Sequence, residues 1–411
     1  MNRQRQSGWL RAALLLSLGL SLGLSFGLCA ALPQQALPDC RLDQARWLGS
    51  HNSFKPVLPS AYYQSVARRI AAALPEHQQA AALQKLQALQ YGHASLTAQL
   101  QQGLRLLELD FLQDRHGGAY ARPLFAAELK QALVDAGQSA AATGYLSPAL
   151  VQPGFKVMHL PDIDFASSCL DARDCLLQLR QWSEAHPGHW PVLVLVNVRE
   201  QGAQAFLTPG LPGAPVDGWQ AADYQALEQL WMSVLGRERL FTPDDLRVLA
   251  SGNTDVQKSP QSLAASVRQH GWPTVAQLAG RFLLLFDGTP AQLERYRTGH
   301  PSLAGRLMFG NYPIGADEAA MLVLNDPVRQ QSDIAAALAQ GLLVRTRSDD
   351  GNQQEPSRFQ AALHSGAQFI SSDFYQGAPQ PAAATGQFRL PADHAHATPF
   401  TAALCDTGEQ F

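Results

Sequence analysis

The chain has few charged residues for its length, and neither sign of charge is in clear excess. Lys and Arg number 31 and Asp and Glu 34 in 411 residues, which gives a formal net charge of −3. Proteins that bind nucleic acid need a basic surface for the phosphate backbone, so this composition excludes nucleic acid from the expected partners. Long apolar runs are also missing after residue 28, and a membrane-spanning helix needs about 20 such residues. We therefore expect no membrane span in the body of the chain.

The first 31 residues have the composition of a targeting segment. The basic stretch MNRQRQSGWLR precedes the apolar stretch ALLLSLGLSLGLSFGL, and the small residues Ala30 and Ala31 follow. This order is typical of a cleaved signal peptide at residues 1–31, and it predicts a secreted or periplasmic protein. An uncleaved anchor is the alternative, because the apolar stretch approaches the length of a bilayer span. A lipidated Cys29 is disfavoured, because Leu28 stands where a small residue is expected.

Cysteine is scarce as well. Five are present, and loss of the signal segment removes Cys29. The remaining even number in an exported chain indicates two disulfides, for which three pairings exist. We favour Cys169–Cys175, which closes a short local loop, and Cys40–Cys405, which joins the two ends of the domain. Metal binding by these cysteines is disfavoured, because the sequence has no CxxC pair.

What the chain does have is a series of apolar runs separated by helical patterns. Hydrophobic residues make up 46% of the sequence, and the helical patterns include LTAQLQQG, CLLQLRQWSEAH and SRFQAALHSG. Alternating strands and helices predict a parallel sheet, and eight strands predict an α/β fold of the TIM barrel kind. The apolar runs lie near residues 46–51, 104–111, 155–160, 191–198, 282–288, 319–325, 341–346 and 367–374.

We expect one barrel domain over residues 38–411. The stretch near residues 60–90 is rich in Ala and Gln and reads as a helical insertion between the first two strands. The stretch at 202–240 mixes turn residues with a helical pattern, and we expect it to cover the active-site face. From about residue 376 a tail rich in Ala, Pro and Gly is expected to wrap the outside of the domain.

Polar side chains follow most of the apolar runs at the same end. In a TIM barrel the carboxyl ends of the strands carry the catalytic groups, so this clustering predicts an active site there. The residues concerned are His51, Asn52, Glu108, Asp110, His159, Asn197, Arg199, Glu200, Asp287, Asn325, Asp326, Arg345, Arg347, Ser372 and Asp373.

Glu108 and Asp110 are two residues apart, so on a strand both carboxylates project from the same face. Together with the amide of Asn52 they form a ligand set for a hard divalent cation. His51 and His159 can then act as general base and general acid. The combination predicts metal-assisted attack on a phosphate ester. The alternative for the carboxylates is an ion pair with Arg105 or Arg345.

At these residues the chain resembles the calcium-dependent phosphoinositide-specific phospholipase C domain of secreted bacterial and fungal proteins. The segments that carry the resemblance are LGSHNSF, YGHASLTAQLQQGLRLLELDF with GGAYARP, VMHLPDIDFASSC, HPGHWPVLVLVNVRE, GWPTVAQLAGRFLLLFDG, VRTRSDD and AALHSGAQFISSDFY. The resemblance implies a distorted TIM barrel of the PLC-like phosphodiesterase type. It also implies cleavage of a glycerophosphoinositol headgroup through a cyclic phosphate.

Position by position, the resemblance assigns His51 and His159 to the two catalytic histidines. It assigns Asn52, Glu108 and Asp110 to the ligands of calcium, which we expect in preference to magnesium. Larger eukaryotic relatives have a further carboxylate ligand near the end of strand four, where this chain has Asn197. We expect Asn197 and the nearby Glu200 either to bind the metal directly or to contact its ligands.

The substrate side of the predicted site is less sharply defined. Arg199, Arg345 and Arg347 are candidates for phosphate contacts, and a salt bridge to Asp373 or Asp349 is the alternative for the last two. Asp373 and Tyr375 are candidates for holding sugar hydroxyls and stacking on a ring, or else cap a strand end. We interpret His93 as structural.

The substrate expected from these features is a phospholipid or other phosphodiester, met at a membrane surface by a monomeric enzyme. A second hypothesis is a glycerophosphodiesterase-like lipid phosphodiesterase. Those enzymes typically begin with His-Arg-Gly, whereas this chain has His51-Asn52-Ser53. A third hypothesis is a non-catalytic barrel that binds lipid or carbohydrate, against which the presence of both histidines and both carboxylates argues. Which histidine is the acid stays open.

Overall fold

The computed structural model describes residues 37, 39–145, 147–203, 212–251, 262–350, 353–379 and 403–405. The predicted signal peptide at residues 1–31 and most of the predicted tail lie outside these residues. Among the described residues, no helix combines the length and the apolar character needed to cross a membrane.

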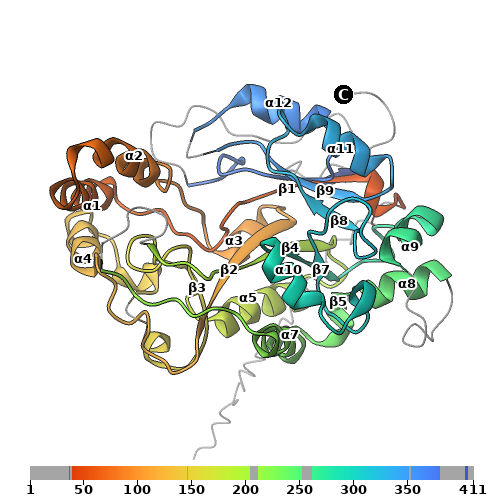
Figure 1. The fold of residues 1–411 in the computed structure, drawn as a ribbon, viewed down its shortest axis with the longest axis horizontal. Coiled ribbons are helices and arrows are strands. Elements are labelled where there is room, and N and C mark those ends of the chain that lie inside the picture. Colours follow the sequence, from red (N-terminus) through yellow and green to blue (C-terminus); the bar gives the residue numbers. More distant parts are fainter. Residues whose placement is uncertain are drawn as a thin grey trace, which may run out of the picture. The chain divides into compact units, whose positions relative to one another are not determined.

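The pairings of eight parallel strands within the described residues form a ring. Helices lie around the strands (Figure 1). Seven of the eight contacts around the ring are ladders of paired strands. The eighth contact is a single parallel bridge between Met321 of β8 and Asn311, the residue that follows β7. The ring is therefore a distorted TIM barrel. Its strands in order are β1 (Ala45–Gly49), β2 (Leu106–Asp114), β4 (Val192–Val198), β6 (Phe282–Asp287), β7 (Phe309–Gly310), β8 (Met321–Val323), β9 (Leu343–Arg347) and β10 (Phe369–Ser371).

The strands are apolar on both faces because one face fills the barrel and the other packs against helices. In β4, with the sequence VLVLVNV, every residue is buried except the half-buried Asn197. The pairing register sets Asp110 of β2 opposite Asn197, and Asn197 opposite Asp287 of β6. Three polar side chains from neighbouring strands therefore lie at one level of the barrel.

The structure corrects the predicted membership of the barrel. The run near residues 155–160 contains a strand, β3 (Gly154–Val157), but it pairs antiparallel with the end of β2 and stands outside the parallel ring. The strand that completes the ring is β7, which has only two residues and was not predicted. A further short strand, β5 (Leu240–Phe241), pairs with the first half of β6.

The helical patterns predicted before β2, before β4 and before β10 are confirmed as α3 (Leu96–Gln101), α5 (Ala172–Ala185) and α12 (Pro356–His364). The pattern at 219–235 forms α7 (Ala221–Leu235), whose Trp231 ring packs edge-on against Phe111 of β2 at 6.4 Å between centroids. The other α-helices of the described residues are α1 (Ser60–Ala73), α2 (Glu76–Gln87), α4 (Ala126–Asp135), α8 (Pro243–Ser251), α9 (Leu263–His270), α10 (Pro290–Arg297) and α11 (Gln331–Leu338).

The predicted insertion between the first two strands is the pair α1 and α2, which lies beside α4 at one side of the barrel (Figure 1). Tyr62, Val66 and Ile70 line one face of α1 and are buried. They belong to a hydrophobic cluster that is separate from the barrel core. This cluster also includes Met158 and Leu160. The residues that flank His159 in sequence are therefore anchored in the insertion's own core.

Both favoured disulfides are present. Cys40 is bonded to Cys405 and Cys169 to Cys175, with Cα atoms 6.1 and 5.1 Å apart. The first bond lies where β11 (Ala403–Cys405) pairs antiparallel with β1. The last described residues of the chain are therefore attached to the first barrel strand both by hydrogen bonds and covalently.

Candidate active site

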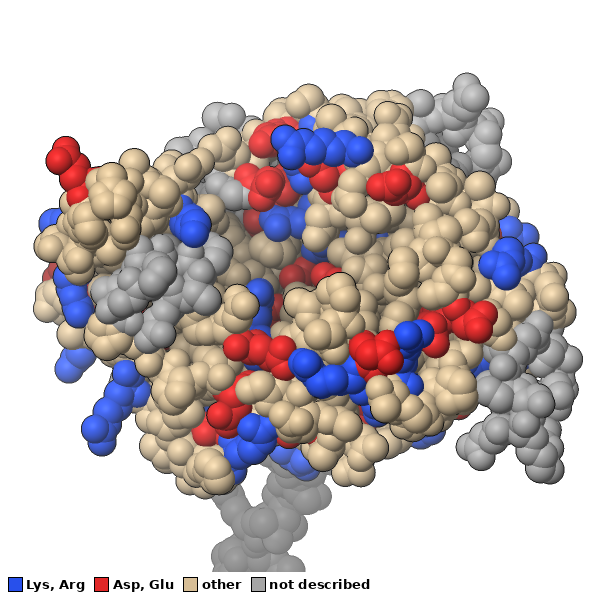
Figure 2. Space-filling model, viewed as in Figure 1, with Lys and Arg blue, Asp and Glu red and all other residues tan. Residues whose placement is uncertain are grey.

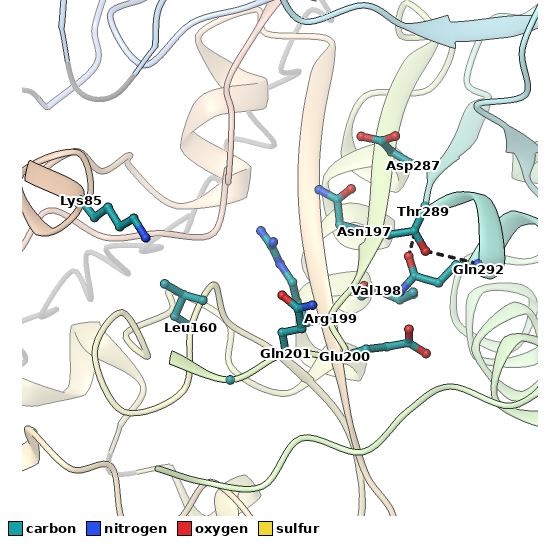
Figure 3. Close-up of a pocket in the computed structure, with 12 residues that line it drawn as sticks. Lys85, Leu160, Asn197, Val198, Arg199, Glu200, Gln201, Asp287, Thr289 and Gln292 are labelled. Carbon is teal, nitrogen blue, oxygen red and sulfur yellow. Dashed lines mark hydrogen bonds between the residues drawn. The ribbon is translucent and has the colours of Figure 1, made fainter. Parts of the chain in front are cut away.

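A cavity of about 700 Å³ opens at the carboxyl ends of β4 and β6. Residues 197–202 and 287–289 line one side, and Lys85 of α2 and Leu160 approach from the other (Figure 3). On the molecular surface, acidic and basic side chains gather in a central hollow of this face (Figure 2). The cavity is where the barrel rule places a catalytic centre.

The loop after β1 carries His51 and Asn52 and is fixed to the middle of β2. The backbone N–H of Ser53 donates to the carbonyl of Glu108 at 3.0 Å, and the Ser53 hydroxyl accepts from the N–H of Glu108 at 2.8 Å. Asn52 has a φ of 48°, a left-handed conformation that costs energy for a residue with a side chain. The loop thus holds a sharp turn beside the predicted carboxylate pair.

The carboxylates of Glu108 and Asp110 are both buried and share one amide donor. Asn197 Nδ2 donates to Glu108 at 2.8 Å and to Asp110 at 3.0 Å. Each carboxylate also has a guanidinium partner. Arg345 donates to Glu108 at 2.7 Å, and Arg199 donates through Nε to Asp110 at 2.9 Å. The ion pair with Arg345 that the sequence left as an alternative is therefore present in the structure.

Burial dominates the electrostatics of Glu108. It raises the pKa of this carboxyl to about 7, against the opposing charge of Arg345 and with the help of the neighbouring Asp110. Because the charge of Asp110 is one cause of the raised pKa, a cation bound to both carboxylates would reduce their mutual repulsion.

The residues present fit a hard divalent cation. Asn52 Oδ1 is buried, and the described residues offer it no hydrogen-bond partner. This oxygen and the carboxylates of Glu108 and Asp110 are donors of the kind that calcium takes. Within the described residues, no group of three or more His, Cys, Asp and Glu side chains could hold a metal. A metal site here would thus need a donor of another kind, such as the amide oxygen of Asn52.

Two further residues proposed for the metal are placed differently. Asn197 presents its NH₂ group to both carboxylates, so in this orientation it is a donor to the ligands. Glu200 points elsewhere, because its carboxylate accepts from the N–H of Trp219 at 2.7 Å and from Arg295 at 2.5 Å. The structure thus brings Asn197, but not Glu200, to the carboxylate pair.

His51 lies between the carboxylate pair and the end of β10. Its Nδ1 is 3.4 Å from Asp373 Oδ1, and its Nε2 is 3.9 Å from Glu108 Oε1 and 3.4 Å from Arg347 Nη1. Burial, followed by the charge of Arg347, holds the pKa of His51 well below its usual value, although Asp373 acts in the opposite direction. His51 is accordingly neutral and able to accept a proton.

His159 has a carboxylate of its own. Its Nδ1 is 2.7 Å from Asp164 Oδ2. A tight turn makes this possible, because Leu160 and Asp164 exchange backbone hydrogen bonds of 3.2 and 3.0 Å. Burial lowers the pKa of His159, and the hydrogen bond to Asp164 offsets part of that effect. Lys55 also donates to Asp164 Oδ2.

The residues predicted for substrate contacts are mostly engaged with the protein. Arg345 is 2% exposed and Tyr375 0% exposed. The Tyr375 ring stacks on His93 at 5.6 Å. Arg347 lies 3.3 Å from Asp349 and 3.4 Å from Asp373, the salt bridges named as its alternative. Arg199, whose side chain is 30% exposed, is the one that lines the cavity.

Sequence reasoning missed Lys55 and Tyr91 and interpreted His93 as structural, and all three contact the site. Lys55 reaches Asp164, Tyr91 Oη accepts from Asn52 Nδ2 at 2.6 Å, and His93 Nε2 donates to the carbonyl of His51 at 2.7 Å. Each belongs to a segment that carried the resemblance or adjoins it. Their positions in or beside those segments could have marked them as site residues. Their contacts could not be predicted, because these depend on how the chain after the insertion packs against the loop that follows β1.

Comparison with known proteins places these residues in context. A model of the family described as phosphoinositide phospholipase C, Ca²⁺-dependent, matches residues 40–397. The comparison with curated proteins finds no match.

Among solved structures, the chain is similar to the calcium-dependent phosphoinositol-specific phospholipase C of a Gram-negative bacterium, Pseudomonas sp., in its apo form. The two are 17% identical over 85% of this chain and 95% of that chain, with a TM-score of 0.50. The likeness supports the barrel fold. A Ca²⁺-dependent phosphatidylinositol-specific phospholipase C from Streptomyces antibioticus is also 17% identical to the chain. The match covers 81% of this chain and 94% of that chain, with a TM-score of 0.47. With the family match over most of its length, the chain belongs to the Ca²⁺-dependent phosphoinositide phospholipase C family, whose members are phosphoric diester hydrolases.

Proposed function

We propose that the protein is an exported, calcium-dependent phosphodiesterase that cleaves phosphatidylinositol-type headgroups at a membrane surface. The attacking group is the substrate's own hydroxyl next to the phosphate, and the first product is a cyclic inositol phosphate. The observation that carries this proposal is that each of the two histidines has its own Asp partner, His51 with Asp373 and His159 with Asp164, and that His51 Nε2 also lies 3.9 Å from the buried Glu108 carboxylate.

The proposed reaction needs one proton removed and one proton supplied. The substrate hydroxyl loses its proton to His51 Nε2 as its oxygen bonds to phosphorus. The bond from phosphorus to the glycerol oxygen breaks, and that oxygen receives a proton from His159 Nε2. Each transfer uses the nitrogen opposite the one that faces an Asp, so Asp373 and Asp164 hold the imidazole rings in a usable orientation.

The calcium ligands in this proposal are Asn52, Glu108 and Asp110. A bound calcium ion supplies positive charge to a phosphate oxygen and lowers the pKa of the attacking hydroxyl. The Arg199 guanidinium sits on Asp110 and lines the cavity, so it is placed to contact the phosphate as well. The polar side chains of Asn197, Thr289 and Gln292 give the cavity wall a surface suited to a polyol headgroup (Figure 3).

The deciding experiment is phosphorus NMR of the products formed from phosphatidylinositol, with calcium and with a chelator. We expect a cyclic phosphodiester resonance that appears only with calcium. A linear phosphomonoester or glycerophosphate without any cyclic species would favour the glycerophosphodiesterase hypothesis. Binding of the lipid without turnover would favour a non-catalytic barrel. Activity that survives the chelator would remove calcium from the proposal.

A further inference from the structure

The segment from Leu89 to His93, which leads out of the helical insertion, lies directly against the loop that carries Asn52. The N–H of His93 donates to the carbonyl of Lys55 at 2.7 Å, and His93 and Pro56 form a parallel β-bridge. The approach is so close that a Cβ on Gly92 would lie 2.5 Å from the carbonyl carbon of Pro56. The two segments are therefore fixed to each other through their backbones.

Tyr91 is buried at this contact, with 4% of its surface exposed. Its hydroxyl accepts a hydrogen bond of 2.6 Å from Asn52 Nδ2, and Lys55 Nζ lies 4.4 Å from the centre of its ring. Backbone, ring and hydroxyl are thus all held in place.

The hydrogen bond has a consequence for the other end of the Asn52 amide. A primary amide has one oxygen and one NH₂ group, and a half-turn about its last bond exchanges them. Because Tyr91 engages the NH₂ group, the oxygen must point the opposite way. That oxygen is buried, and no described residue hydrogen-bonds to it. Outer partners that orient a metal ligand in this way are typically worth about 10- to 100-fold in metal affinity.

We propose that Tyr91 is a positioning residue that fixes the Asn52 amide so that Oδ1, and not the NH₂ group, faces the cation. The inference rests on the calcium site of the proposed function and adds a residue outside the ligand set. It assigns a role to Tyr91, for which the sequence alone predicted none.

The test is the calcium affinity of the full-length protein, measured by isothermal titration of the metal alone, without substrate. Tyr91→Phe removes the hydroxyl and keeps the ring. We expect it to weaken calcium binding about 10- to 100-fold. The matched control is Tyr63→Phe, because the Tyr63 hydroxyl is also buried and donates to the carbonyl of Leu89 at 3.0 Å. The control should bind calcium like the wild type.

The same Tyr91→Phe change in an Asn52→Asp variant distinguishes a loss of amide orientation from a loss of packing. In Asn52→Asp the two oxygens are equivalent, so rotation of the group no longer matters. Adding Tyr91→Phe to Asn52→Asp should therefore change calcium affinity by less than about threefold. Thermal melts in chelator check that Tyr91→Phe and Tyr63→Phe are equally folded.

Three results would overturn the inference. Calcium affinity in Tyr91→Phe equal to that of the wild type would do so while leaving the proposed function intact. An equally large loss in the Asn52→Asp background would show that Tyr91 acts by packing and not by orienting the amide. Absence of calcium binding in the wild type would remove the proposed calcium site and this inference with it.

Discussion

Lys55 and His159 meet on one oxygen of the same carboxylate. Asp164 Oδ2 accepts from Lys55 Nζ and lies 2.7 Å from His159 Nδ1, and the side chains of Lys55 and Asp164 are 1% and 2% exposed. Burial alone would raise the pKa of the Asp164 carboxyl, but Lys55 and His159 together hold it below its usual value. The carboxylate is therefore ionised, and the same oxygen contacts both the Lys55 amino group and the His159 imidazole.

The first prediction concerns the charge of Lys55. Its positive charge is one of the causes that lower the pKa of His159, while Asp164 raises it. Lys55→Met removes the cation and leaves the carboxylate to His159 alone, so the pKa of His159 should rise. We expect the alkaline limb of kcat/KM to move to higher pH, and NMR titration of the His159 ring should show the same shift.

The control for this variant is Lys156→Met. Lys156 is equally buried, but its amino group donates to the backbone carbonyls of Gln152 and Gly154. Its removal should leave the titration of His159 unchanged. A titration curve that is the same in Lys55→Met and the wild type would show that Lys55 does not tune His159.

The second prediction tests His159 as the acid that protonates the leaving group. General acid catalysis is typically worth about 10²–10⁴-fold, so His159→Ala should lose that much on a substrate with a glycerol leaving group. With a nitrophenyl leaving group the loss should be much smaller, because that oxygen departs as a stable anion. His51→Ala should lose similar activity on both substrates. Equal losses on both substrates for His159→Ala would refute the assignment.

The third prediction compares Asp110 with Glu200, two of the three acidic residues proposed for the metal. Asp110→Asn removes charge but not shape from the carboxylate pair, so calcium affinity and activity should fall together. Glu200→Gln should leave calcium affinity unchanged, because the Glu200 carboxylate bonds to Trp219 and Arg295. Calorimetric titration of calcium into both variants tests this difference. Weaker calcium binding in Glu200→Gln would instead place Glu200 at the metal.

The fourth prediction concerns stability in acid. Burial lowers the pKa of His189 to about 4, and the ring is held by the carbonyl of Trp190 and the hydroxyl of Ser183. A histidine whose pKa is lowered by folding stabilises the fold fully above its unfolded value near 6.5. That contribution is lost as the pH falls towards 4, and it amounts to about 3 kcal/mol.

His189→Asn should therefore flatten the dependence of unfolding free energy on pH between about 7 and 4, as measured by urea denaturation. His186→Asn is the control, because His186 lies on the surface three residues earlier. A wild-type curve that is flat over this range would contradict the prediction.

The sequence predicted the kind of barrel but not all of its members. A continuous apolar run indicates a strand without giving its direction, so the run near 155–160 was assigned to the parallel ring although β3 is antiparallel. The true member, Phe309–Gly310, is too short to leave a pattern. Its place in the ring depends on pairing with β6 and on the bridge from Asn311 to Met321.

The site was predictable where sequence spacing alone fixes a neighbour. Glu108 and Asp110 share a face because they are two apart on a strand, and the barrel rule brings Asn197 beside them. The approach of Asp373 to His51 was not predictable, because it depends on how the end of β10 closes the ring. The burial of Tyr375 under His93 depends on the packing of the insertion's last residues. Such contacts follow from tertiary packing, which local patterns do not encode.

The bond between Cys40 and Cys405 spans 365 residues of sequence. A protease that cuts once anywhere between these two cysteines leaves both fragments covalently attached. On a gel without reductant, such a nicked protein keeps the mass of the intact chain, and it separates into two bands only after reduction. In the exported protein proposed above, this bond would keep both ends of the chain attached to the barrel after a single cleavage.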